Sequence, residues 1–406
     1  MATGRRFRIG RRCSGRTSIA TTPGSSGIFS SSEGDGGVRQ DRPLVASGIV
    51  IAYRLFDIAY AIDLAKAEAL WARRMRSVST RAQLNATPAK AMAFGVPPVE
   101  IGLEPVALQM GTASVTARLY DFGVLTIAVL QRVSDLRWPD FVERVNATER
   151  WLGTGAESNL WGSLLSQVRT TFHDAMVRPA KSAVEEDYLI AAVEAFDEPM
   201  SAEQLQARID LIPLLSGERR ALSPSARQEV LRQRFSYYTD DLVVLTWDRA
   251  FIYEPRGDSD VVDVLEVANA QLLEMRYYDE LLDAELPRMY DLIERAQGAA
   301  GLFASWRFAN LARRLTTLVA EVTELTEKVD NALQVTEDVY LARVYAAALE
   351  SFRVRAVGAA VDRKLAIIRD SYTALYHEAS AARAALMEAV IVLLIAIEIV
   401  LAVFRH

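Results

Sequence analysis

The sequence ends in a run of 21 residues, 384–404, that is apolar apart from two glutamates. At a rise of 1.5 Å per residue, a helix of this length spans about 31 Å, close to the ~30 Å thickness of the hydrocarbon core of a bilayer. The alternative is a buried C-terminal helix, but apolar residues on every side of a helix leave no polar stripe for water. The run therefore predicts a single-pass transmembrane helix at 384–404, with the rest of the chain on the side of the membrane where it is synthesised.

Composition narrows the classes of function. The chain has 51% hydrophobic and 24% charged residues, as an ordinary globular protein does. The net charge of the whole chain is −6, and its first 45 residues are basic, so the rest of the chain is clearly acidic. An acidic surface disfavours binding to nucleic acid. A single cysteine, Cys13, excludes an internal disulfide, and three scattered histidines form no local zinc motif. We expect no cofactor and no metal.

The first 45 residues are rich in glycine, serine and arginine and cannot build a core. We predict a disordered basic tail over 1–45. An organellar transit peptide and a misplaced start codon are the two alternatives.

Residues 46–256 predict a mixed α+β domain. Strands are expected at 49–56, 99–110, 114–130 and 187–196, and helices at 62–75 and 138–152. The resulting order, βαββαβ, is typical of a ferredoxin-like fold. Two further short strands within 234–255 are expected to close this domain.

Residues 257–383 predict long helices that form a coiled coil. Apolar residues recur at alternating spacings of four and three in two stretches, as in the a and d positions of a heptad. These two seams are expected to pair as an intramolecular hairpin, to mediate self-association, or both. Their central members are Leu318, Val322, Leu325, Leu365, Ile368 and Leu375.

Motifs that would carry catalysis are incomplete. The Asp-Phe-Gly sequence at 121–123 occurs without the glycine-rich loop, strand lysine or catalytic loop of a kinase, and the chain has no phosphate-binding loop. We predict no catalytic residues. Tyr237, Tyr238, Asp240 and Asp241 are an unusual mixture of aromatic and acidic residues, which indicates a turn into a hairpin or a surface for a protein partner.

Glu388 and Glu398 are the charged residues inside the apolar run. A carboxylate near the centre of a bilayer costs about 2.5–3.5 kcal/mol on insertion scales, so Glu398 should lie near the interface or face another helix. Glu388 is expected at the near headgroup layer. We predict that both take part in membrane association.

The C-terminal sequence resembles a known family of membrane proteins. The segment E-x-x-I-x-x-L-I-A-I-E-I at 388–399, the YDFGV strand at 120–124 and the helix after Asp240 and Asp241 are similar to those of the required-for-meiotic-nuclear-division, or sporulation-associated, family. The resemblance covers about 46–404 and implies a divergent, bacterial, membrane-anchored member without established enzymatic activity.

These features together predict a non-enzymatic, tail-anchored scaffold or tether. Its expected partners are the lipid bilayer, an unidentified protein, and further copies of the chain bound through the helices. The expected location is the bacterial cytoplasmic membrane, with the mitochondrial inner membrane as the alternative. Two other hypotheses are an oligomeric CorA-like ion channel subunit, although such channels have two membrane helices, and a membrane-bound enzyme that uses Asp240 and Asp241.

Overall fold

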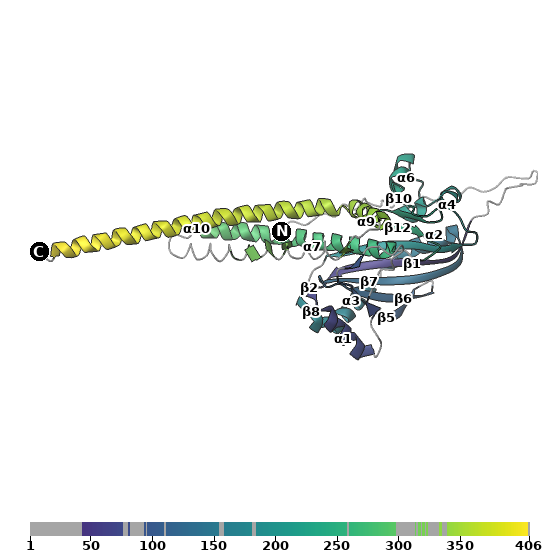
Figure 1. The fold of residues 1–406 in the computed structure, drawn as a ribbon, viewed down its shortest axis with the longest axis horizontal. Coiled ribbons are helices and arrows are strands. Elements are labelled where there is room, and N and C mark those ends of the chain that lie inside the picture. The colour runs from purple at the N-terminus through teal and green to yellow at the C-terminus, as the bar shows by residue number, and fades with distance from the viewer. Residues whose placement is uncertain are drawn as a thin grey trace, which may run out of the picture. The chain divides into compact units, whose positions relative to one another are not determined.

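The computed structural model contains, within the residues that it describes, one mixed sheet of nine strands (Figure 1). The structure describes residues 43–75, 80–81, 93–94, 96–108, 111–153, 158–180, 184–257, 260–297, 313, 316–317, 319–320, 322–323, 333–334 and 339–404. Residues 1–42, most of the predicted basic tail, lie outside this set.

Strand β1 (Leu44–Asp57) lies near the middle of this sheet. It pairs antiparallel with β7 (Val124–Arg137) on one side and with β9 (Glu185–Phe196) on the other, so that Ile51 is opposite both Leu130 and Ile190. Strand β12 (Arg249–Tyr253) adds to β9 in parallel. The complete order is β10-β11-β12-β9-β1-β7-β6-β5-β3, with β3 at Thr80–Arg81, β5 at Val99–Leu108, β6 at Gly111–Leu119, β10 at Gln233–Phe235 and β11 at Leu242–Leu245.

Two small ladders lie outside the main sheet. Strand β2 (Ala59–Ile62) pairs with β8 (Met176–Pro179), and β4 (Ala93–Phe94) pairs with β13 (Leu333–Gln334).

The predicted ferredoxin-like fold is wrong. The segment 114–130, expected as one strand, forms the end of β6, a turn and the start of β7. In this turn Gly123 has φ +99°, and a Cβ at this position would lie 1.8 Å from the carbonyl oxygen of Ala59. The turn adds a strand, so that a meander of β5, β6 and β7 stands where the ferredoxin-like order has a hairpin of two strands. In addition, β12 pairs with β9 in parallel, whereas neighbouring strands of a ferredoxin-like sheet are antiparallel.

Helices cover both faces of the sheet. Alternate residues of β1 enter two cores: Tyr53 and Leu55 pack toward α7 (Val261–Gln297), and Val50 and Phe56 pack toward the opposite face. The first core is completed by α9 (Val339–Ser351) and α10 (Val354–Phe404). The second is built by α1 (Leu64–Met75), α2 (Trp138–Gly153), α3 (Ser158–Phe172), η1 (His173–Ala175), α4 (Ala202–Arg208) and α5 (Ile212–Ser216), while α6 (Pro224–Val230) buries no residue.

Helices α7 and α10 lie side by side (Figure 1). The Nζ atom of Lys364 on α10 lies 2.6 Å from a carboxylate oxygen of Asp279 and 2.6 Å from one of Asp283, both on α7. Of the predicted seam residues, Val322, Leu365 and Ile368 are buried in the core that contains α7. Leu318, Leu325 and the side chain of Leu375 lie outside the described residues, so the pairing of the two predicted seams stays a prediction.

Within the part of the chain that the structure describes, no helix has the length and apolar character needed to cross a membrane. This finding contradicts three predictions, namely a transmembrane helix at 384–404, a single-pass anchor and a location in the membrane. This segment is the end of the 51-residue helix α10.

A partly buried ion-pair cluster joins the sheet to α7. Arg118 on β6 contacts Glu100 on β5 at 2.7 Å, and Asp263 and Glu266 on α7 at 2.7 and 2.8 Å. The hydroxyl of Tyr120 donates a hydrogen bond to Glu266 at 2.8 Å. Burial raises the pKa of Glu266, and the positive charge of Arg118 opposes this shift.

We predict that Arg118→Met lowers the free energy of unfolding by about 3–5 kcal/mol, because the carboxylates of α7 lose the cation that compensates their burial. Urea denaturation measures this change. The matched control is Arg132→Met, since Arg132 is 81% exposed and lies 3.8 Å from Glu194. The control should change stability by less than about 1 kcal/mol. Equal effects of the two substitutions would show that the cluster does not hold α7 on the sheet.

Candidate functional site

The predicted partner surface lies in the loop between β10 and β11. Asp241 is buried, and its carboxylate accepts hydrogen bonds from the backbone amides of Tyr237 and Tyr238 at 2.7 and 2.9 Å. Its observed contacts are thus those of a turn, while both tyrosine rings stay exposed. The ring of Tyr237 packs on that of Tyr340 at 5.4 Å, and the guanidinium of Arg256 lies over Tyr238.

Asp240 is half-buried in the same loop. The structure thus brings the four predicted residues together, and the two rings and Asp240 remain accessible for a partner. That a protein binds there stays a prediction.

Trp247, at the tip of the β11–β12 hairpin, is an exposed aromatic residue that the predicted surface omits. It is 74% exposed. Tryptophan is enriched among the residues that dominate binding energy at protein interfaces. The sequence contained this signal, because an aromatic residue next to Asp248 between two short apolar strands is typical of a hairpin tip.

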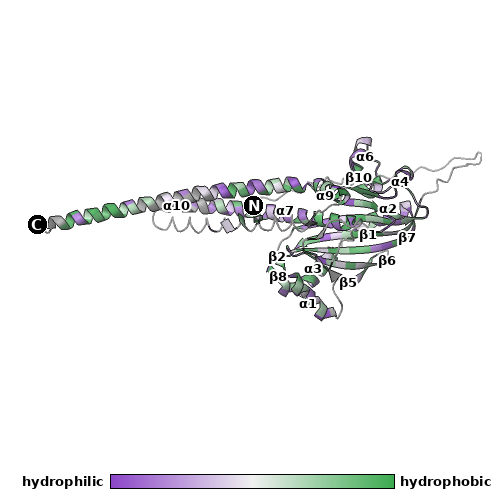
Figure 2. Ribbon diagram, in the orientation of Figure 1, coloured by the Kyte–Doolittle hydropathy of each residue, from purple (hydrophilic) through white to green (hydrophobic). Residues whose placement is uncertain are grey.

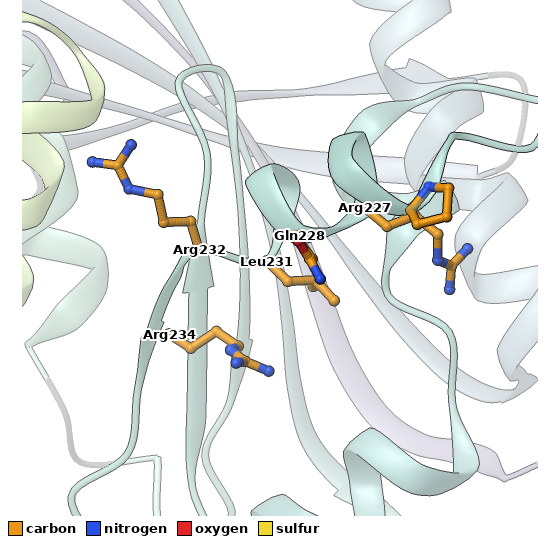
Figure 3. Close-up of a pocket in the computed structure, with 6 residues that line it drawn as sticks. Arg227, Gln228, Leu231, Arg232 and Arg234 are labelled. Carbon is orange, nitrogen blue, oxygen red and sulfur yellow. The ribbon is translucent and has the colours of Figure 1, made fainter.

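An open, arginine-lined pocket of about 560 Å³ lies beside α6 and β10 (Figure 3). The guanidinium of Arg227 is bound by Asp210, that of Arg232 by Glu229 and Glu350, and Arg234 donates to Gln206. Figure 3 shows the side chains of Arg227 and Arg232 pointing away from each other. Because the charges of Arg227 and Arg232 are compensated by carboxylates and their side chains do not converge, the pocket does not form an anion-binding site.

A second, smaller cavity, of about 40 Å³, lies where the end of β1 meets α7. Asp57 and Glu274 line it and are only 3% and 2% exposed. The hydroxyl of Tyr278 donates to one oxygen of Glu274 at 2.6 Å. Within the described part of the chain, the other oxygen of Glu274 and the Oδ2 atom of Asp57 have no hydrogen-bond partner.

The pKa values of both carboxyl groups are raised by this environment. Burial raises the pKa of Asp57 to about 7, although the charge of Arg169 opposes the shift. Burial and the neighbouring Asp57 raise the pKa of Glu274 to about 8. Two acidic groups with displaced pKa values in one cavity are a feature of functional sites.

Sequence reasoning did not identify this pair. Asp57 follows an apolar strand, as many turn residues do, and Glu274 belongs to a helix in which acidic residues are frequent. Nothing in the local pattern indicates that the two meet, because 217 residues separate them and the contact depends on how α7 crosses the sheet.

Of the other predicted positions, Val322 lines the smaller cavity, whereas Glu388 and Glu398 line neither. Glu388 and Glu398 are exposed on the last part of α10. Among the described residues, no group of three or more histidine, cysteine, aspartate or glutamate side chains is arranged to hold a metal ion.

Comparison with known proteins assigns the sheet region to a family. The family model described as "Uncharacterized protein MJ0711, N-terminal domain" matches residues 47–260, which is more than half of the chain. The chain belongs to this family. A relative, "Uncharacterized protein MJ0711" from Methanocaldococcus jannaschii, is 25% identical to this chain over 221 residues. The matched residues cover 54% of this chain and 66% of that protein. No solved structure matches significantly.

The predicted membership in the meiotic-nuclear-division family is therefore wrong. The matching family is a different one, and the relative is archaeal rather than bacterial. The motif at 388–399, which carried most of the resemblance, lies outside the matched residues and consists largely of isoleucine, leucine and alanine. Such letters recur in any strongly apolar helix, so they do not distinguish families.

The shifted pKa values predict a pH-dependent stability. Since a carboxyl group in the unfolded chain has a pKa near 4, the folded protein retains protons on Asp57 and Glu274 that the unfolded chain releases. The stability that protonated Asp57 and Glu274 contribute to the folded protein is fully present below about pH 4. It is lost as pH rises through about 7 and 8, with a slope of about 1.4 kcal/mol per pH unit for each group.

We therefore expect the double variant Asp57→Asn/Glu274→Gln to gain stability relative to the wild type between pH 5 and 8 and to keep a constant advantage above pH 8. Urea denaturation in a metal-chelating buffer, in which only protons compete for the carboxylates, measures this difference. A difference that does not vary with pH would contradict the raised pKa values.

Proposed function

We propose that this protein is a non-enzymatic scaffold that assembles through the apolar end of α10. The observation that carries the proposal is the exposure of this stretch. Its large apolar side chains between 387 and 401 are each 43–63% exposed. Figure 2 shows the same stretch as a continuous hydrophobic section of the helix. Contiguous apolar surface of this kind marks an interaction site rather than a stable free surface.

Further copies of the same chain are the partner that fits this surface best. Successive residues of a helix point about 100° apart, so Val390, Ile391, Val392 and Leu393 cover all sides of α10. One neighbouring helix covers only one stripe. Three or more parallel copies of α10 bury every side, and isoleucine-rich seams favour such higher assemblies over dimers.

In this proposal the sheet region carries the surface for a protein partner. The exposed rings of Tyr237, Tyr238 and Trp247 support this role, because tyrosine and tryptophan are enriched at interfaces. Assembly through α10 would present several copies of this surface together and raise the strength of binding without any new contact.

We predict that Ile391→Glu/Ile395→Glu lowers the oligomer mass of the purified full-length chain in analytical ultracentrifugation. Each buried isoleucine contributes about 1.5–3 kcal/mol per copy, so the association constant should fall by at least about a hundredfold. The control is Ile367→Glu, because Ile367 is an exposed isoleucine of α10 outside the apolar end. A wild-type protein that sediments as a monomer, or a control that dissociates as readily as the double variant, would refute the proposal.

A further inference from the structure

We propose that the cavity between Asp57 and Glu274 binds one alkaline-earth cation, with Ca²⁺ as the ion that fits best. This site is independent of the assembly of α10. It would link β1 to α7 through a metal ion held by two carboxylates.

The unpartnered oxygens are the first argument. The Oδ2 atom of Asp57 and the Oε1 atom of Glu274 are buried and have no hydrogen-bond partner within the described residues. Buried polar atoms are nearly always satisfied by protein, water or an ion, because leaving them unpaired is costly. Both atoms belong to side chains that line the same cavity.

The charges around the cavity favour a cation. The carboxylates of Asp57 and Glu274 come from two different elements, and after burial the charge of Asp57 is the largest cause that raises the pKa of Glu274. Arg169 approaches from α3, but its guanidinium donates to the backbone carbonyl of Asp57 at 3.4 Å and leaves the Oδ2 atom unpaired. A divalent ion would compensate both carboxylates, as buried charges require.

The size and chemistry of the cavity select the ion. Its volume, about 40 Å³, suffices for one ion with one to three waters, since each water needs roughly 10–15 Å³ on this measure. Mg²⁺ releases its water ligands reluctantly, whereas Ca²⁺ accepts irregular sets of oxygen ligands. Asp57 and Glu274, which line the cavity, offer carboxylate oxygens, which hard cations prefer over nitrogen and sulfur ligands.

Isothermal titration of the chelator-treated full-length chain with CaCl₂ at pH 8.5 tests the site. We expect saturable binding of one Ca²⁺ per chain and a rise in melting temperature with Ca²⁺. Asp57→Asn and Glu274→Gln should each weaken binding by at least about tenfold, because even the loss of an outer-shell partner of a metal costs about 10–100-fold. The controls are Asp174→Asn and Glu280→Gln, which remove exposed carboxylates outside the cavity and should bind as the wild type does.

The variants themselves show whether a loss of binding is specific. Without Ca²⁺ at pH 8.5, both cavity variants should melt at or above the wild-type temperature, because each removes an uncompensated buried carboxylate. A variant that is folded but does not respond to Ca²⁺ thus supports the site. Absence of saturable binding in the wild type, or binding that persists in the double variant Asp57→Asn/Glu274→Gln, would overturn it.

Discussion

The burial of α7 between the sheet and the pair α9–α10 is the constraint on which the rest of this structure depends. The first half of the helix is buried on nearly all sides although it carries several charged residues. A buried charge is tolerated only where a partner compensates it. Arg118 supplies that partner for the buried Glu266 and the partly buried Asp263. The more exposed charges of α7 are paired as well, Arg276 with Glu186, and Asp279 and Asp283 with Lys364. Because these partners come from β6, β9 and α10, the same contacts that neutralise α7 also fix its rotation and its position along the sheet.

This arrangement explains why the central strands are apolar on both faces. With α7 on one side and α2 with its neighbours on the other, β1 sends Tyr53 and Leu55 into one core and Val50 and Phe56 into the other. An antiparallel sheet with one face in water would alternate apolar and polar residues. The nearly continuous apolar sequence of β1 therefore already reflects the second layer of helices.

Local periodicity in the sequence located most helices and strands of the region 44–257, but it did not determine how they assemble. The strand at 49–56 and the helix at 138–152 correspond to β1 and α2, because alternation and helical spacing are local properties. The predicted ferredoxin-like arrangement is wrong because the tight turn at Gly123 divides one expected strand into β6 and β7, and because β12 joins β9 in parallel, which no local pattern indicates. The partners of Glu266 and Glu274 could not be predicted, since an acidic residue in a helix is usually solvated and only tertiary packing buries these two. The apolar C-terminal run is interpreted from its length and from the apolar residues on every side, and neither property identifies what covers such a helix.

The buried carboxylates and the apolar end of α10 lie on connected elements, which relates the two proposals. Lys364 joins α10 to Asp279 on α7, five residues beyond Glu274, so a change in how α10 packs can reach the cavity through a shift of α7. A cation held by Asp57 and Glu274 would resist that shift, because it fixes α7 to the end of β1. Energetic coupling between two sites is reciprocal. Such coupling arises only if the ion binds with different affinity to the assembled protein and to the free chain, because α7 lies in a different position in each. If α7 does not move on assembly, the cation strengthens the fold equally in both states and the two sites act independently.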